Sequence, residues 1–231
     1  MTSPRVNFAQ LIWKTVGMLA VFILSLFLPT GTIAWPAGWL YVAVFFVFVL
    51  GLTSWLVRYD PALLTERLTG LGRSDQKKWD KVFSAIIAVG FFAWLAVMGL
   101  DVARLRWSHM PWWLQGIGLV VLLISFYVFY LTFRENTYLS PVVRIQRERG
   151  HKVVRTGLYR HIRHPMYAGF ILYVLGTALT LGSWLGIALG LLLIAVVARR
   201  AVFEERTLQR ELSGYDEYMA KVRYRLIPGV W

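Results

Sequence analysis

The chain has 231 residues, of which 58% are hydrophobic and 16% aromatic, and it carries a formal net charge of +13. Its mean hydropathy of +0.56 is far above that of a soluble domain of this length, so the composition excludes a soluble globular protein and predicts an integral membrane protein. The absence of cysteine excludes disulfides, thiolate catalysis and cysteine-ligated metals.

Four continuous apolar runs are long enough to cross a bilayer as helices. A hydrocarbon layer of about 30 Å is spanned by about 20 helical residues. We expect the first run to stay in the membrane, because it is too long for a signal peptide and lacks a cleavage site of small residues. The four predicted spans are 11–28, 39–57, 82–100 and 112–133.

A fifth apolar region, 165–198, is interrupted at 181–183 by the letters LGS. Its two halves would be about 25 Å and about 22 Å long at a rise of about 1.5 Å per residue, which is marginal for a full crossing. The pattern therefore favours a helical hairpin that enters and returns on the same side. Within it, Gly182, Gly186 and Gly190 recur every four residues and predict close packing between helices.

The basic residues collect in segments that this topology places on one side. Of the 25 Lys and Arg, 23 lie near the N-terminus or in 58–81, 134–163 and 199–225; the other two are Arg104 and Arg106. Because cytoplasmic loops collect Lys and Arg, we expect the N-terminus, both large loops and the C-terminal tail to be cytoplasmic. This distribution favours attraction to anionic headgroups over nucleic-acid binding.

These features predict an all-α polytopic membrane bundle with four spanning helices, a C-terminal helical hairpin and a cytoplasmic C-terminal helix. No repeat, low-complexity tract or linker divides the chain, so we expect a single membrane domain over 1–231, with the four spans in 1–133 and the hairpin and C-terminal helix in 134–231. In segment 58–81, Pro61, Gly70 and Gly72 bound a short amphipathic piece. That piece predicts a helix lying on the headgroups.

The stretch YRHIRHPMYAG at 159–169 concentrates charged and aromatic side chains just before the hairpin. A residue before proline is pushed out of the helical region and proline suits the first helical position, so a helix should begin at Pro165. Its free N–H groups would offer an anion site beside Arg163, His164 and Tyr167, and Gly169 would let a backbone or a flat ring approach. The alternative is an ordinary helix start with snorkelling arginine and interfacial tyrosine.

A second polar cluster, RRAVFEERTLQREL at 199–212, follows the hairpin. Arg200 and Glu204 are four residues apart and share one helix face, while Glu204 and Glu205 are adjacent carboxylates. An exposed pair of this kind contributes only about 0.3–0.5 kcal/mol and is an ordinary surface feature. The hairpin, however, returns it to the membrane edge that holds His164, where ionisable groups are functional candidates.

Together, the two clusters resemble the motifs of the integral-membrane methyltransferases, namely the isoprenylcysteine carboxyl methyltransferases and the related phospholipid N-methyltransferases. The resemblance covers about 134–231. Within this part, the segment that precedes the first motif resembles bacterial members of the family. The tail also resembles the family's closing pattern at Leu208, Ser213, Tyr215 and Tyr218, although Gly214 falls one place later than the usual glycine. The residues that match the two motifs are Gly157, Tyr159, Arg163, His164, Pro165, Tyr167 and Gly169, followed by Arg200, Glu204 and Glu205.

The resemblance implies a methyltransferase in a bacterial cytoplasmic membrane that binds S-adenosylmethionine at the cytoplasmic face and takes a lipid or prenylated substrate from the bilayer. It assigns Arg200 to the substrate side. The sulfonium is already a strong electrophile, so no metal is expected. Residues implied to contact the donor are His151, Lys152, Val153 and Val154 of the donor-binding loop, with Tyr159, His164, Pro165, Met166, Tyr167 and Glu204.

The acceptor and the reaction class remain open at this point. A carboxylate acceptor would favour a nearby cation such as Arg200, whereas an amine acceptor must lose a proton and would favour a carboxylate such as Glu205. The ending VRYRLIPGVW resembles the membrane sterol reductases, which use NADPH and share an R-H-P-x-Y-x-G stretch but are longer. A non-catalytic membrane protein is the third alternative, and binding of S-adenosylmethionine, NADPH or neither separates the three.

Overall fold

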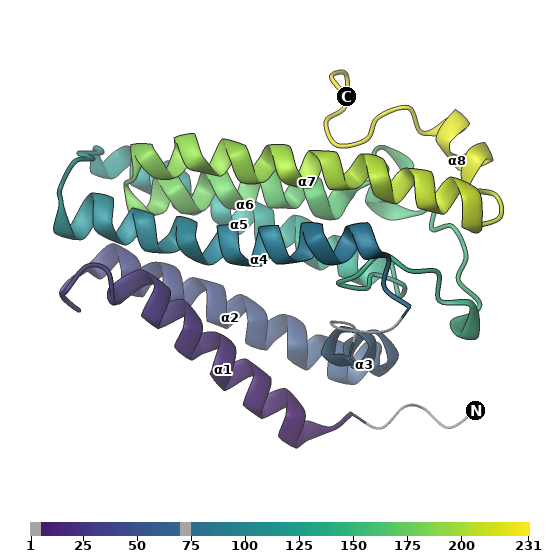
Figure 1. The fold of residues 1–231 in the computed structure, drawn as a ribbon, viewed down its shortest axis with the longest axis horizontal. Helices are drawn as coiled ribbons and strands as arrows, with labels where there is room; N and C mark the ends of the chain where they lie inside the picture. The colour runs from purple at the N-terminus through teal and green to yellow at the C-terminus, as the bar shows by residue number, and fades with distance from the viewer. Residues whose placement is uncertain (1–5, 70–74) are drawn as a thin grey trace.

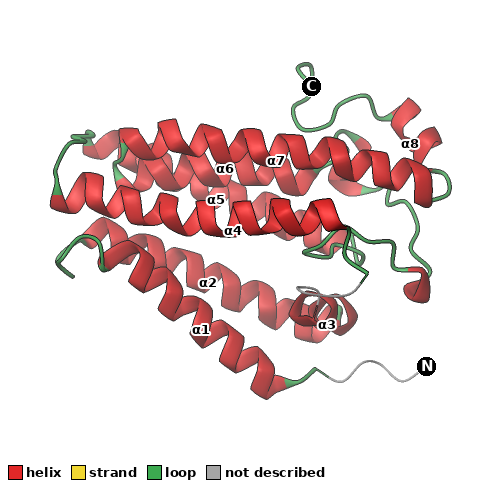
Figure 2. Cartoon of the chain, in the orientation of Figure 1, coloured by secondary structure: helices red, strands yellow, loops and turns green. Residues whose placement is uncertain are grey.

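The structure is a computed structural model that describes residues 6–69 and 75–231, and it is built from helices joined by loops and turns (Figure 2). A π-helical turn, Leu100–Arg104, continues α4. The helices are α1 Phe8–Phe27, α2 Pro36–Tyr59, α3 Pro61–Thr69, α4 Lys78–Gly99, α5 Trp112–Glu135, α6 Pro165–Leu181, α7 Trp184–Glu211 and α8 Tyr215–Lys221.

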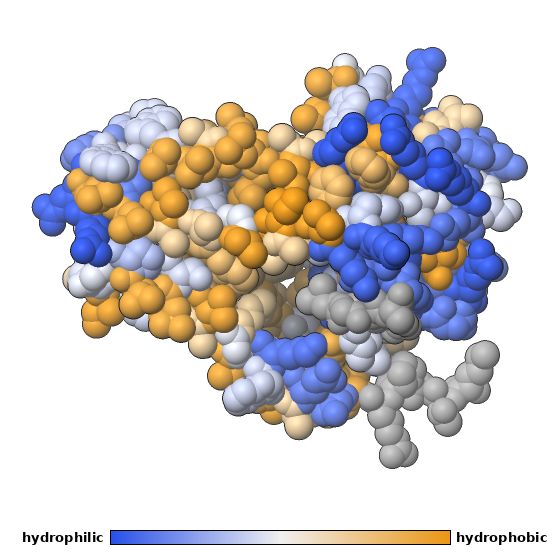
Figure 3. Space-filling view, in the orientation of Figure 1, coloured by the Kyte–Doolittle hydropathy of each residue, from blue (hydrophilic) through white to orange (hydrophobic). Residues whose placement is uncertain are grey.

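Five of these helices are long and apolar enough to cross a membrane, which agrees with an integral multi-pass protein. The four predicted spans are confirmed as α1, α2, α4 and α5, with ends that differ from the predicted ones by a few residues. Large apolar side chains such as Trp13, Val47 and Val89 are exposed along them, as expected where lipid replaces water as the solvent. Figure 3 shows the resulting hydrophobic surface over the middle of the molecule and a hydrophilic end at the right.

The predicted hairpin is α6 and α7. Gly182 ends α6 with a φ of +82°, a left-handed conformation that glycine adopts without a steric penalty. The side chain of Ser183 then caps α7 by accepting a hydrogen bond from the Gly186 N–H. The expectation that both halves are marginal in length is wrong for α7, because this helix continues unbroken from the apolar run into the polar segment and has 28 residues.

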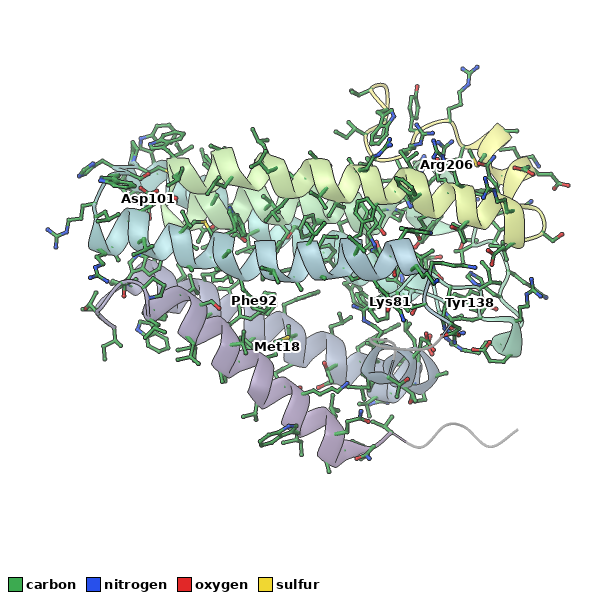
Figure 4. The ribbon with its side chains drawn as sticks, viewed as in Figure 1. Met18, Lys81, Phe92, Asp101, Tyr138 and Arg206 are labelled. Atoms are coloured by element: carbon green, nitrogen blue, oxygen red, sulfur yellow. The ribbon has the colours of Figure 1, made fainter. Side chains whose placement is uncertain are left out.

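The hairpin reaches the far end of the bundle. Ser183 Oγ donates a hydrogen bond to Asp101 Oδ2 at 2.5 Å, and the Trp184 N–H donates to Ser108 Oγ at 3.0 Å. Asp101 lies just beyond α4, at the end of the molecule opposite Tyr138 (Figure 4). Both hairpin ends therefore return to the same edge, as predicted, after a full passage alongside α4 and α5.

Small residues let the central helices approach closely. A Cβ added at Gly118 of α5 would lie 2.5 Å from the Thr180 backbone nitrogen of α6, and one added at Gly176 would lie 2.6 Å from the Leu122 nitrogen. In α7, Gly186 packs on Met98 in the same way. Close packing is thus confirmed for the hairpin glycines, except that Gly182 serves the turn.

The polar segments gather at one end of the bundle, at the right in Figure 1. This end carries the start of α1, the short α3, the loop between α5 and α6, and α8. The predicted short helix in 58–81 is confirmed as α3, while Gly70 and Gly72 lie outside the described residues. The sequence thus brings its two motif clusters to the same polar end.

Candidate functional site

A cavity of about 310 Å³ opens at the polar end of the bundle. Its walls come from the 136–154 loop, the start of α6, the end of α7, α8, and Arg67 of α3. Arg200 lines this cavity, whereas Pro165 and Glu205 are not part of its lining. Of the ten residues implied to contact the donor, nine line it: His151, Lys152, Val153, Val154, Tyr159, His164, Met166, Tyr167 and Glu204.

Helix α6 begins at Pro165, as predicted, with His164 outside the helical region at a φ of −127°. The C-terminal segment holds this start in place, because the Arg163 and His164 N–H groups donate to the carbonyls of Tyr224 and Arg225 at 3.0 Å and 2.9 Å. The close approach expected at Gly169 is confirmed, since a Cβ there would lie 2.8 Å from the Phe129 ring. The C-terminal segment and α5 therefore both hold the start of α6 in place.

Arg200 connects the cavity to α4. Its Nε donates to Asp80 Oδ1 at 2.9 Å, its Nη1 to Tyr167 Oη at 2.7 Å, and its Nη2 to the Pro141 carbonyl at 3.2 Å. Tyr167 Oη in turn donates to Glu204 Oε2 at 2.5 Å. The ion pair that the spacing suggested between Arg200 and Glu204 is replaced by this bridge, and the carboxylate that pairs with Arg200 is Asp80.

Glu205 has a different position from Glu204, although the two are adjacent. It is 2% exposed and accepts from Arg163 Nε at 2.6 Å and from Arg225 Nε at 2.7 Å, while His164 Nε2 lies 3.2 Å away. A carboxylate with three partners in a buried site stabilises their arrangement. Glu205 thus links α7 to the start of α6 and to the C-terminal segment. It lies behind the residues that line the cavity.

The loop that carries His151 is held by stacking and by a backbone contact. The ring of Tyr138 stacks on His151 at 4.4 Å, and the Gln146 N–H donates to His151 Nδ1 at 3.3 Å. Burial, aided by the charges of Arg149 and Arg144, lowers the pKa of His151 to about 4. At neutral pH this side chain is therefore an uncharged part of the cavity wall.

One residue of the cavity lining carries an unsatisfied polar atom. Tyr215 Oη is buried and has no hydrogen-bond partner among the described residues, whereas Tyr159 Oη accepts from Asn136 Nδ2 at 2.8 Å. Buried polar groups without a partner are rare and call for a ligand or an ordered water. Together with the Glu204 carboxylate and the apolar Val153 and Val154, this hydroxyl fits a ligand that has polar groups on an apolar body, as S-adenosylmethionine has.

Several lining residues were missed by the sequence analysis. Arg67 and Asn136 lie outside both motifs, while Asp80, which is fully buried, sits behind the lining and holds Arg200. A signal for Asp80 was present, because an acidic residue at the start of an apolar span is an ionisable group at the membrane edge. Arg67 and Asn136 had no such signal, since only the fold brings α3 and the end of α5 to the cavity.

Comparison with known proteins identifies the part of the chain that forms most of this site. Residues 113–213 match the model of the family described as phospholipid methyltransferase. A rice protein (Oryza sativa subsp. indica) named "Probable protein-S-isoprenylcysteine O-methyltransferase" is 34% identical over 115 residues, which cover 48% of this chain and 60% of that protein.

Two further relatives show the same similarity. Protein-S-isoprenylcysteine O-methyltransferase B of Arabidopsis thaliana is 30% identical over 119 residues, 48% of this chain and 58% of that protein. The Schizosaccharomyces pombe protein-S-isoprenylcysteine O-methyltransferase is 34% identical over 85 residues, 36% of each chain. The chain therefore matches less than two thirds of the length of these relatives. The comparisons therefore confirm that this chain is similar to the phospholipid methyltransferase family over 113–213, and to protein-S-isoprenylcysteine O-methyltransferases over about half of its length.

Proposed function

We propose that this protein is an S-adenosylmethionine-dependent methyltransferase that acts on a lipid or prenylated acceptor in the membrane. The observation that carries the proposal is the convergence of both sequence motifs, far apart in the chain, on one cavity at the polar end of the bundle. Similarity to the phospholipid methyltransferase family over 113–213 supports it. The names of the relatives favour a prenylated cysteine as the acceptor.

The residues of the cavity would bind and align rather than react. When bound, S-adenosylmethionine supplies an electrophilic methyl group, which passes to the acceptor oxygen or nitrogen as its sulfonium becomes a thioether. The Glu204 carboxylate would accept hydrogen bonds from the donor's hydroxyl or ammonium groups, and Tyr215 Oη would gain a partner. Arg200 would face the acceptor while it holds the hydroxyl of Tyr167 in place.

Alignment and exclusion of water suffice for such a transfer. Bringing the acceptor atom in line with the methyl carbon, at about 3 Å, can supply much of the rate enhancement without a metal or a protein nucleophile. The stacked rings of Tyr138 and His151 and the packed rings of Tyr159 and Tyr218 line the cavity and would shield part of it from water. An amine acceptor would also have to lose a proton. Among the described residues, Glu204 is the carboxylate that lines the cavity, whereas Glu205 lies behind the lining.

The test is to incubate the purified protein with methyl-labelled S-adenosylmethionine and membrane lipids or an S-prenylated cysteine, and to identify the labelled product by mass spectrometry. Calorimetry with S-adenosylhomocysteine measures the donor site separately. Glu204→Gln should weaken this binding by about 1.5–3 kcal/mol, the value of one charge-assisted hydrogen bond, or on the order of tenfold to a hundredfold. Unchanged affinity in a folded Glu204→Gln variant would remove Glu204 from the donor site, and binding of NADPH instead would support the reductase alternative.

A further inference from the structure

Among the described residues, five Arg and Lys side chains line the cavity, and three of them are paired with carboxylates. These pairs are Arg144 with Glu66 at 2.9 Å, Arg163 with Glu205 at 2.6 Å, and Arg200 with Asp80 at 2.8 Å. The other two are Lys152, which is exposed in the loop beside His151, and Arg67 of α3, which is half-buried. Lys152 is open to solvent, which compensates an exposed charge, so Arg67 is the cation whose situation needs an explanation.

Arg67 has spare hydrogen-bonding capacity. Its Nη1 donates to the Leu139 carbonyl at 3.0 Å and its guanidinium lies 4.7 Å from the centre of the Phe133 ring. Within the part of the chain that the structure describes, Nε and Nη2 donate no hydrogen bond and no carboxylate lies within ion-pair distance of Arg67. The undescribed stretches 1–5 and 70–74 contain no Asp or Glu.

This arrangement costs stability unless something compensates the charge. Burial lowers the pKa of Arg67 to about 10, so the side chain remains a cation at neutral pH. A partly buried cation without an anion is destabilising in the free protein, and such groups in a cavity are candidates for ligand binding. Arg200 is less suited to bind a further anion, because Nε, Nη1 and Nη2 already donate to protein atoms.

The surroundings of Arg67 indicate that the ligand is amphiphilic. Phe133 belongs to an apolar cluster that includes Leu139 and Met166, which line the cavity, and Leu52 and Trp55 of α2. Leu52 and Trp55 also line an apolar groove of about 410 Å³ between α2 and α5. Arg67 thus lies where the cavity meets an apolar surface that continues into the membrane-spanning part of the bundle.

We propose that Arg67 binds the anionic group, a carboxylate or a phosphate, of the membrane amphiphile that accepts the methyl group. This inference rests on the proposed function and adds to it a positioning residue that lies outside both motifs and outside the matched segment 113–213. The planar guanidinium has one edge, Nε with Nη2, that donates to no atom of the described residues and is suited to a two-pronged contact with carboxylate or phosphate oxygens. Arg67 therefore selects acceptors that carry an anion next to an apolar tail.

The experiment compares wild type, Arg67→Gln and Arg67→Lys in mixed micelles that contain S-adenosylhomocysteine. Equilibrium binding is measured for two pairs of probes: an S-prenylated N-acetylcysteine and its carboxamide, and phosphatidylethanolamine and diacylglycerol. The first pair differs in its carboxylate, and the second differs in the zwitterionic headgroup that carries the phosphate, so the pair that wild type discriminates identifies the source of the anion. The control is Arg58→Gln, because Arg58 is an exposed arginine at the same end of the bundle that lies over Tyr59 at 5.6 Å and does not line the cavity.

Wild type should prefer one probe that carries an anionic group over its counterpart without that group by on the order of tenfold to a hundredfold, as expected for a charge-assisted contact. Arg67→Gln should abolish this preference, Arg67→Lys should restore part of it, and Arg58→Gln should keep it. A misfolded variant would lose binding of the neutral probe and of S-adenosylhomocysteine as well, which separates folding from recognition.

Two results would overturn the proposal. The first is a wild type without preference for either anion, or an Arg67→Gln variant that keeps the preference. The second is an Arg67→Gln variant with weakened S-adenosylhomocysteine binding and a normal anion preference, which would place Arg67 in the donor site. Methyl transfer to the preferred probe is measured in parallel, and its absence in wild type would reject the proposed function without deciding the role of Arg67.

Discussion

Arg200 is held by three acceptors at once, and its replacement by lysine separates charge from geometry. A lysine keeps a cation for Asp80 but cannot also donate to Tyr167 Oη and to the Pro141 carbonyl. We expect Arg200→Lys to bind S-adenosylhomocysteine almost as wild type does and to lose turnover on the order of a hundredfold, the effect of a misplacement of about 1 Å. Calorimetry and methyl-transfer rates measure the two effects.

The matched control is Arg199, one residue earlier on the same helix. It is exposed and lies over the Phe203 ring at 5.1 Å, away from the cavity lining. Arg199→Lys should therefore keep full activity. Equal turnover of the two variants, both folded and able to bind the product, would show that Arg200 positions nothing in the reaction.

His151 gives a prediction for pH dependence. Its pKa is lowered to about 4 in the folded protein from its usual 6.5, mainly by burial. As the pH falls below about 6.5, unfolded chains bind a proton on His151 while folded ones do not, so the stability contributed by this group is full at higher pH and declines towards pH 4. We expect the thermal midpoint of wild type to fall more steeply between pH 6.5 and 5 than that of His151→Asn, and parallel curves would contradict the assigned shift.

At the scale of elements, the contact between α5 and α6 depends on Gly118. A methyl group added there would lie 2.5 Å from the backbone nitrogen of Thr180, whereas one added at Gly116, two residues earlier in α5, would meet nothing within 4 Å. Since backbone atoms cannot move aside without separating the helices, Gly118→Ala should destabilise the protein by about 1–3 kcal/mol.

Gly116→Ala is the control for this prediction, because alanine favours a helix over glycine and the site is open. Its thermal midpoint in detergent should equal or slightly exceed that of wild type. If both alanine variants melt together, the two helices do not approach at Gly118 as closely as the structure indicates.

The helices themselves could be predicted because each depends on a local pattern. The apolar runs predicted α1, α2, α4 and α5. The conformational restriction on a residue before proline predicted the start of α6 at Pro165. The length of α7 was underestimated, because its polar last three turns continue the helix while hydropathy stops near Arg199. A span ends where apolar residues end, but a helix ends where its hydrogen bonding and capping end.

Contacts between distant segments could not be predicted in the same way. The i,i+4 spacing of Arg200 and Glu204 indicated a pair, yet Asp80, which is 120 positions earlier, is the carboxylate that Arg200 contacts. The spacing of residues in the sequence shows which side chains share a helix face. It does not show which side chains of other segments the fold brings into contact with them. The same holds for Arg67, whose place at the cavity follows from the packing of α3 against the loop after α5.

At the scale of the whole molecule, the distribution of charge predicts how the bundle is oriented in the membrane. The polar end carries the motif clusters and the basic loops, while Arg104 and Arg106 follow α4 near the opposite end. Because cytoplasmic loops collect Lys and Arg, we expect the end with the cavity to face the cytoplasm. This orientation would also expose the cavity to cytoplasmic S-adenosylmethionine.

Single cysteines test the orientation, since the chain has none of its own. Thr32 is exposed in the loop between α1 and α2, and the side chain of Glu217 on α8 is 75% exposed at the polar end. An impermeant thiol reagent added to intact cells should label Thr32→Cys and spare Glu217→Cys, and lysis should make the second site reactive. Ser74 lies outside the described residues, so Glu217 is the better cytoplasmic position.

Ser183 at the hairpin tip serves as an internal control in the same experiment. It lies at the same end as Asp101 but is fully buried through its hydrogen bond to that residue, so Ser183→Cys should resist labelling in intact cells and after lysis. Labelling of Glu217→Cys from outside, with protection of Thr32→Cys, would invert the bundle. The cavity would then face away from the cytoplasm, and a donor made there could not reach Glu204 without transport across the membrane.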